Sequence, residues 1–80
     1  MAKLYVQRRA LVERLLRTKV WCERCNTGRS RVVHEKKLRS AGGDILDEEN
    51  CVVLCTPCHD FIHRHPKESQ RLGWLQRRFE

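Results

Sequence analysis

The sequence predicts a small α+β domain that a bound metal ion holds together and that carries an added N-terminal helix. Three observations support this fold class. A chain of 80 residues allows one domain. At this size only about 60% of the unfolded surface becomes buried, so a small core needs additional stabilisation, for example by a metal site. Two Cys-x-x-Cys pairs supply four candidate metal ligands. Two short β-branched runs lie between segments of helical periodicity.

We divide residues 1–80 into an N-terminal helix (1–17), a metal knuckle with the domain core (18–66) and a C-terminal packing segment (67–80). The first part predicts a basic amphipathic helix over residues 2–17, because its apolar residues recur at helical intervals. Such a helix closes a small core, and its arginines also suit a phosphate backbone. The apolar positions are Leu4, Tyr5, Leu11, Val12, Leu15 and Leu16, and the basic ones are Arg8, Arg9, Arg14 and Arg17.

The second part predicts a knuckle, two strands and a helix. Turn-forming residues fill 18–30, and the β-branched run in 31–35 predicts a first strand. The loop after it turns at Gly42-Gly43, where glycine permits a positive φ, and the apolar run 51–55 predicts the second strand. A helix then begins with Thr56 as N-cap, has proline in its first turn and stops before Pro66.

In the third part, Gly73 is expected to interrupt a segment that packs back on the core. The side chains expected to pack are Leu72, Trp74, Leu75 and Phe79.

The charge of the chain favours a polyanionic partner, with nucleic acid as the first candidate. Seventeen Lys and Arg against ten Asp and Glu leave a net charge of +7. No apolar run approaches the ~18 residues of a membrane span, and no signal-peptide-like stretch opens the chain, so we expect a cytoplasmic protein. In a reducing cytosol, Cys-x-x-Cys pairs are more often metal thiolates or redox centres than disulfides, and the odd number of cysteines agrees.

Four of the five cysteines predict a structural zinc site. Cys22 with Cys25, and Cys55 with Cys58, have the spacing at which two thiolates hold one ion from a tight turn. A closed site of four thiolates leaves no position for substrate, so it serves as scaffold. Cys51, in the second predicted strand, is expected to be a small buried side chain.

Three of the four histidines predict a second, catalytic metal site. His59 and His63 are four residues apart on the predicted helix and therefore share one face. His34 ends the first strand and offers a third imidazole, whereas His65 points away from that face. Three neutral imidazoles leave open positions around an ion, which water and a phosphate oxygen can fill. Taken alone, the spacing of His59 and His63 also fits ordinary surface histidines.

These residues give the chain a resemblance to the HNH endonucleases of the ββα-metal (His-Me finger) type, in particular to small, phage-encoded, zinc-stapled members. The resemblance covers Cys22 to Pro66, with CERC at 22–25, VHEKKLRSAGGD at 33–44, Asn50 and LCTPCHDFIH at 54–63 in the family's order. It implies a metal-dependent endonuclease that hydrolyses DNA phosphodiester bonds, nicks one strand and leaves 3′-hydroxyl and 5′-phosphate ends. It also implies a bacterial host cytoplasm. We take a monomer that makes single-strand nicks as the default state, because cleavage of two strands by one site requires two encounters or a dimer.

The resemblance assigns roles to individual residues. His34 and His59 would coordinate the catalytic divalent ion, with His63 completing or supporting that shell. Asn50 would fix the loop by hydrogen bonds and so orient the base, although an ordinary turn residue is the plainer interpretation. The ion could be Mg²⁺, Mn²⁺, Ni²⁺ or Zn²⁺, because imidazole accepts all of them. The expected phosphate contacts are Arg29, Arg31, Lys36, Lys37, Arg39 and Arg64.

Glu35 departs from the commonest family pattern, which has at this position a second histidine as the general base. A carboxylate can accept the proton of water, although its ordinary pKa of about 4.3 makes it a weaker base. Neighbouring side chains on a flat strand point to opposite faces, so this role requires a bend at His34 and Glu35. Glu35 could instead contact the metal or its water, or be non-catalytic. A shifted register would make His34 the base and leave the ion to His59, His63 and a carboxylate.

Two further functions compete with this one. A non-catalytic zinc-ribbon module would bind nucleic acid through its knuckle and basic faces. A partner-dependent component of a phage DNA-packaging complex would act with packaging proteins and cut poorly when purified alone. Cleavage by the purified protein, and its loss in His59→Ala, distinguish the nuclease from both.

Overall fold

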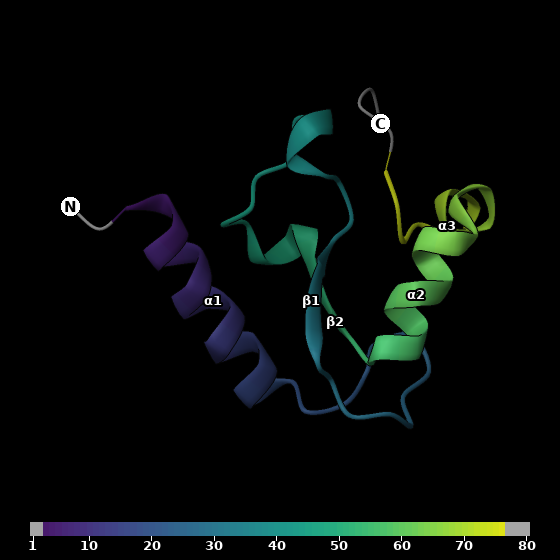
Figure 1. The fold of residues 1–80 in the computed structure, drawn as a ribbon, viewed down its shortest axis with the longest axis horizontal. Coiled ribbons are helices and arrows are strands. Elements are labelled where there is room, and N and C mark those ends of the chain that lie inside the picture. Colours follow the sequence, from purple (N-terminus) through teal and green to yellow (C-terminus); the bar gives the residue numbers. More distant parts are fainter. Residues whose placement is uncertain (1–2, 77–80) are drawn as a thin grey trace.

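The computed structural model describes residues 3–76 and has a small α+β fold. Helix α1 (Leu4–Thr18) leads through the knuckle to strands β1 (Val32–Glu35) and β2 (Cys51–Leu54), which form one antiparallel sheet. Helices α2 (Thr56–Arg64) and α3 (Pro66–Leu72) follow. Figure 1 shows α1 and α2 on opposite sides of this sheet, so the described part of the chain has three layers. None of its helices is long and apolar enough to cross a membrane.

The two strands pair in a regular register, with His34 opposite Val52 and Glu35 opposite Cys51. Successive side chains of a strand point to opposite faces, so the sheet separates two small cores. One core is shared with α1 and the other with α2. The first contains Leu11, Leu15, Cys51 and Val53, and the second contains Cys22, Val52, Leu54, Cys55, Cys58 and Ile62.

Helix α1 packs on the sheet through its C-terminal half. Leu11 and Leu15 are buried, and Leu16 packs beside them, whereas Leu4 and Tyr5 are 41% and 68% exposed. Fifteen helical residues extend over about 22 Å, but a four-residue strand covers only about 13 Å. The first turns of α1 therefore reach beyond the sheet (Figure 1), and the predicted packing of Leu4 and Tyr5 is wrong.

The helix after β2 begins one residue earlier than predicted. Cys55 is its N-cap, and Thr56 is its first helical residue. The helix ends at Arg64, before Pro66, as the sequence predicts.

Helix α3 is a finding that the sequence analysis did not predict. Pro66 stands in its first turn, and Gly73, with φ of +87°, follows its last residue, which are typical helix boundaries. Beyond Gly73, Trp74 and Leu75 pack against the core as expected. Leu72 is 49% exposed, so its predicted packing is wrong. Phe79 lies outside the described residues.

Candidate metal centres

Four thiols converge where the knuckle meets the first turn of α2. The Sγ atoms of Cys22, Cys25, Cys55 and Cys58 lie within 4.8 Å of one another, and those of Cys25 and Cys55 are 3.8 Å apart. Tetrahedral zinc with Zn–S bonds of ~2.3 Å requires sulfur separations of about 3.8 Å. All four cysteines are free of disulfide bonds. The cluster can hold a metal ion, which confirms the predicted grouping.

Hydrogen-bond donors around the sulfurs favour the thiolates that a metal needs. The backbone N–H groups of Arg24 and Cys25 lie 3.4 and 3.5 Å from the Cys22 sulfur. Hydrogen bonds from the backbone and hydroxyl of Thr27 and from the backbone of Gly28 lower the pKa of Cys25 to about 5. Burial raises the pKa of Cys58 to about 12. The pKa rises because burial disfavours the negative thiolate of Cys58. A metal cation bound to the sulfur in place of the proton would neutralise that charge and stabilise the thiolate.

The three predicted histidines form a second cluster, on the α2 side of the sheet. One ring nitrogen from each of His34, His59 and His63 lies within 4.8 Å of the other two. The Nε2 atoms of His59 and His63 are 3.0 Å apart, and two imidazole nitrogens bound to one ion at ~2.0–2.1 Å lie about 2.9 Å apart at a right angle and about 3.4 Å apart in a tetrahedron. The cluster includes no carboxylate from residues 3–76. The shifted register, which needs a carboxylate ligand, is therefore not the arrangement found.

The backbone at Trp74 determines which nitrogen of His34 can bind a metal. His34 Nε2 lies 2.7 Å from the Trp74 carbonyl oxygen, and the ring is almost fully buried. Because a carbonyl only accepts hydrogen bonds, Nε2 carries the proton and Nδ1 is left unprotonated. The segment that follows α3 thus orients a candidate ligand.

Burial lowers the pKa of two of the three imidazoles and so favours their neutral form, which is the form that binds metal. It lowers the pKa of His34, and the charges of His59 and His63 lower it further, against the hydrogen bond to Trp74. Burial and the charge of His63 also lower the pKa of His59. Exposure increases from buried His34 through half-buried His59 to exposed His63. The cluster therefore opens to the surface at His63, where a polymer can reach it.

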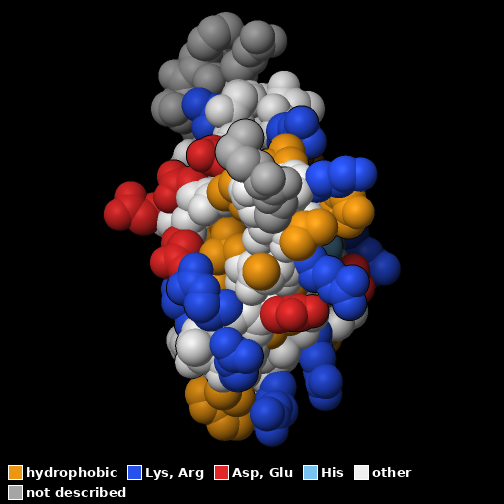
Figure 2. Space-filling view, turned by 90° about the vertical axis from the view of Figure 1, so that its left-hand side faces the viewer, with side chains coloured by type: hydrophobic (Ala, Val, Ile, Leu, Met, Phe, Trp, Pro, Cys, Tyr) orange, Lys and Arg blue, Asp and Glu red, His pale blue; other side chains and the backbone are white. Residues whose placement is uncertain are grey.

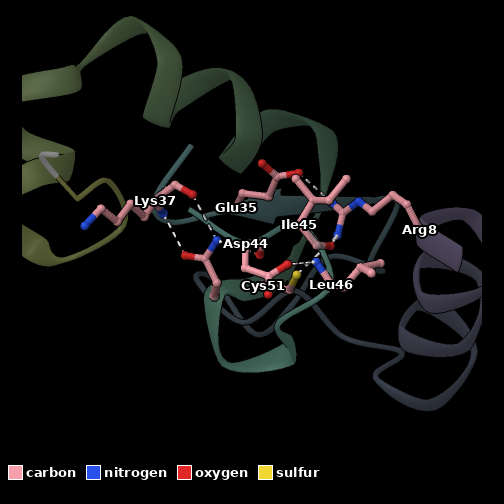
Figure 3. Close-up of polar contacts among 8 residues, drawn as sticks. Arg8, Glu35, Lys37, Asp44, Ile45, Leu46 and Cys51 are labelled. Atoms are coloured by element: carbon pink, nitrogen blue, oxygen red, sulfur yellow. Dashed lines mark hydrogen bonds and ion pairs between the residues drawn. The ribbon is translucent and has the colours of Figure 1, made fainter. Parts of the chain in front are cut away.

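Glu35 does not join the histidines. Its Oε1 atom lies 3.1 Å from Nη2 of Arg8, a residue of α1 (Figure 3). Because successive side chains of a strand alternate, Glu35 points to the opposite face of the sheet from His34. Glu35 pairs regularly with Cys51, so the strand lacks the bend that the base role requires. Arg8 also donates from Nη1 to the Ile45 carbonyl at 2.8 Å and to the Cys51 sulfur at 3.3 Å. Cys51 is buried and lies outside the four-cysteine cluster, as predicted.

Asn50 fixes the loop by hydrogen bonds, as the resemblance implies. Its Oδ1 accepts from the Lys37 N–H at 2.8 Å, and its Nδ2 donates to the Lys37 carbonyl at 2.9 Å (Figure 3). Nδ2 also lies 3.3 Å from the Asp44 carbonyl oxygen. Gly42 has the expected positive φ of +95°, and a Cβ on Gly43 would overlap with the Lys37 carbonyl group.

The predicted phosphate contacts differ in exposure. Four are exposed, namely Arg29, Arg31, Arg39 and Arg64, and two are half-buried, namely Lys36 and Lys37. The structure places none of them among the ligands of either cluster.

The chain has no match among protein-family models, curated proteins or solved structures. The resemblance to HNH endonucleases therefore depends on the motifs of the sequence.

Sequence reasoning missed Trp74 and Arg24, which support the two clusters, and Arg8, which holds Glu35 on the other face of the sheet. Trp74 orients His34 through its backbone, and Arg8 holds Glu35. Arg24 places its guanidinium 3.9 Å from the Phe61 ring centroid and directs Nη1 to the Cys58 sulfur at 3.5 Å. The backbone contact has no signal in the sequence. A signal for Arg8 existed, since it precedes buried Leu11 and Leu15 by three and seven residues and so lies near their face of the helix.

Proposed function

We propose that the protein is a metal-dependent endonuclease that hydrolyses phosphodiester bonds in DNA. The observation that carries the proposal is the convergence of three imidazoles at an open edge of the molecule, separate from a four-thiol cluster. The order of strand, loop, strand and helix over residues 32–64 agrees with the order that the HNH resemblance implies.

In this proposal the four cysteines hold a structural Zn²⁺. Support comes from the soft thiolate ligands, which select zinc over magnesium or calcium, and from the 3.8 Å separation of two sulfurs. Four protein ligands close the coordination shell, so this centre holds the knuckle against α2 and takes no part in chemistry.

The histidine cluster would hold the catalytic ion, through Nδ1 of His34 and one nitrogen each of His59 and His63. A divalent cation there supplies Lewis acidity to a phosphate oxygen and to the attacking water. All three ligands are neutral, so they leave the positive charge of the site uncompensated. That charge suits a phosphodiester anion, and the net charge of +7 draws the polymer to the protein.

We assign Glu35 a structural role outside the histidine cluster. Its carboxylate is occupied by Arg8 across the sheet from the histidines, so it does not accept the proton of the attacking water. Asn50 holds the loop between the strands against Lys37, which keeps the end of β1 beside β2. The Trp74 carbonyl holds the ring of His34 in place.

The test is nicking of supercoiled plasmid by protein whose loosely held metal has been removed and whose tight ion is retained. Mg²⁺, Mn²⁺, Ni²⁺ and Zn²⁺ are added back singly. His59→Ala removes one ligand, and His65→Ala is the matched control, because His65 is exposed, stacks on Phe61 at 4.5 Å and lies outside the cluster. We expect cleavage that requires an added ion, disappears in His59→Ala and persists in His65→Ala.

Two outcomes would contradict the proposal. Full activity of His59→Ala would exclude the histidine cluster as the active site. Absence of cleavage with every ion, from folded protein that binds DNA, would favour the zinc-ribbon module or the component that needs packaging proteins.

A further inference from the structure

The knuckle presents a tryptophan that neither metal cluster uses. The Trp21 side chain is 56% exposed, although the next residue, Cys22, is fully buried in the four-cysteine cluster. Trp21 forms an antiparallel bridge with Arg29. Two backbone hydrogen bonds of 2.8 Å flank this bridge, from Cys22 N–H to the Gly28 carbonyl and from Ser30 N–H to the Val20 carbonyl. The indole is therefore displayed from a fixed backbone.

The bridge places an arginine beside the indole. The hydrogen bonds of the bridge are made by the residues next to Trp21 and Arg29 and not by these two residues themselves. Trp21 and Arg29 are therefore a non-hydrogen-bonded pair, the type of antiparallel pair in which the two side chains lie closer together. Side chains of such a pair lie on one face of the ribbon, with Cβ atoms about 4.5–5.5 Å apart. Within residues 3–76, neither Arg29 nor Arg31 forms an ion pair with a carboxylate. Both guanidinium groups are exposed and available to an anion.

Further cations precede the tryptophan. Arg17 lies in the last turn of α1, and Lys19, whose Nζ lies 3.8 Å from Oε1 of Glu23, follows the helix. Figure 2, which views the α1 side, shows Lys and Arg around an apolar group at the lower end, while acidic side chains gather higher, along one edge. We call the set of Arg17, Lys19, Trp21, Arg29 and Arg31 the Trp21 surface.

We propose that the Trp21 surface binds an unpaired stretch of DNA, with one base stacked on Trp21 and the adjacent phosphates on Arg29 and Arg31. An unpaired nucleotide offers an aromatic face together with an anion, which are the two features that this surface can bind. Bases in a duplex are already stacked on one another, so a single indole finds no free face there. An apolar protein surface that covered the indole would also bury the neighbouring cations without an anionic partner, which is energetically costly. Such a partner is therefore disfavoured.

This inference extends the proposed function but uses none of its catalytic residues. A nuclease that opens or nicks DNA meets unpaired nucleotides beside its cleavage site, and the Trp21 surface would hold them outside the histidine cluster.

The test measures binding of a short labelled oligothymidine to the full chain carrying His59→Ala and its cysteine-bound ion, so that no cleavage interferes. We expect Trp21→Ala to weaken binding about tenfold or more, which is the usual effect of losing one stacked base. Trp21→Phe should retain most of the affinity. Tyr5→Ala is the matched control, because Tyr5 is also an exposed aromatic residue but lies at the other end of α1.

Fluorescence gives a second readout. The oligothymidine should quench the indole emission of the parent protein, and this quenching should be lost in Trp21→Phe, which leaves Trp74 as the remaining tryptophan. Equal affinities of Trp21→Ala and the parent protein would overturn the proposal. So would tighter, Trp21-dependent binding of the matching duplex. Binding that depends on Trp21, together with no plasmid cleavage, would reject the proposed nuclease and support the Trp21 surface. Plasmid cleavage together with binding that does not depend on Trp21 would support the nuclease and reject the Trp21 surface.

Discussion

Arg8 connects α1 to both strands by polar contacts, in addition to the ion pair that Arg14 of the same helix forms with Glu48. It reaches Glu35 on β1, Cys51 on β2 and the Ile45 carbonyl in the loop between them. The side chains of Arg8 and Glu35 are only 17% and 19% exposed, so this ion pair is screened less than a surface pair. The carboxylate of Glu35 thus holds α1 against the sheet.

We predict that Glu35→Gln keeps plasmid nicking but lowers the free energy of unfolding. The loss should be about 1 kcal/mol, because the partly buried Arg8 guanidinium keeps its charge but loses its anionic partner. Urea unfolding and nicking measure the two effects. Glu13→Gln is the control, since its pair with Arg9 is exposed and should matter less. Lost nicking with unchanged stability would restore Glu35 as the base.

His34 makes stability depend on pH. Burial lowers its pKa in the folded state, so as pH falls below about 6.5 the unfolded chain takes up a proton first. The stability contributed by the neutral imidazole is therefore complete above about pH 6.5 and is lost as pH falls toward the folded pKa. We predict a lower urea midpoint on the acid side for protein without metal at the histidines. His34→Gln should flatten this dependence, and an equally steep profile in that variant would exclude His34 as its source.

At the scale of elements, the segment after α3 positions the histidine cluster. Gly73 adopts φ of +87°, which lets the chain turn so that the next carbonyl, that of Trp74, reaches His34. The following segment is anchored as well, since the Gln76 N–H donates to the Lys36 carbonyl at 2.7 Å. A helix that the sequence analysis missed therefore ends in the turn that supports a ligand.

We predict that Gly73→Val weakens metal binding at the histidines about tenfold to a hundredfold, as loss of a residue that orients a ligand usually does. Valine is strained at positive φ, so the Trp74 carbonyl should move. Gly42→Val is the matched control, because Gly42 has φ of +95° and, like Gly73, has open space where a Cβ would lie. Titration with Ni²⁺ or Co²⁺ measures the affinity. Equal weakening in both variants would exclude a specific role for Trp74.

At the scale of the whole molecule, the four-cysteine ion is expected to decide whether the chain folds. The α2-side core consists largely of the cluster cysteines and of residues that pack on them. We predict that Cys58→Ser, or removal of the tight ion by a chelator, abolishes the cooperative unfolding transition seen by circular dichroism, because metal binding in such sites is folding free energy. Cys51→Ser is the control and should leave the transition in place. A cooperative transition in the ion-free protein would contradict this prediction.

Much of this arrangement could be predicted from the sequence, because it depends on short spacings. The Cys-x-x-Cys pairs, the four-residue step from His59 to His63 and the β-branched strands all act over a few residues. The remainder depends on contacts across the chain. Forty residues separate His34 from Trp74, so this backbone contact has no local signature. The spacing of Arg8 from Leu11 and Leu15 indicates its face of α1, but it does not identify Glu35 as its partner. Helix α3 does have boundary signals in the sequence, namely Pro66 and Gly73. The short segment between them has no apolar stripe, so periodicity does not indicate a helix there.

Helix α2 contributes ligands to both clusters, with Cys58 in its first turn and His59 and His63 just beyond. A nine-residue helix is not stable alone in water. The two histidines can therefore face one another only after the thiolate end of the helix has been anchored. We expect the protein to acquire its two ions in a fixed sequence, with the cysteines loaded during folding and the histidines afterwards. If the cysteines hold zinc and the histidines hold a second ion, as proposed, a cell short of zinc would contain chains that are unable to take up the second ion, however abundant that ion is.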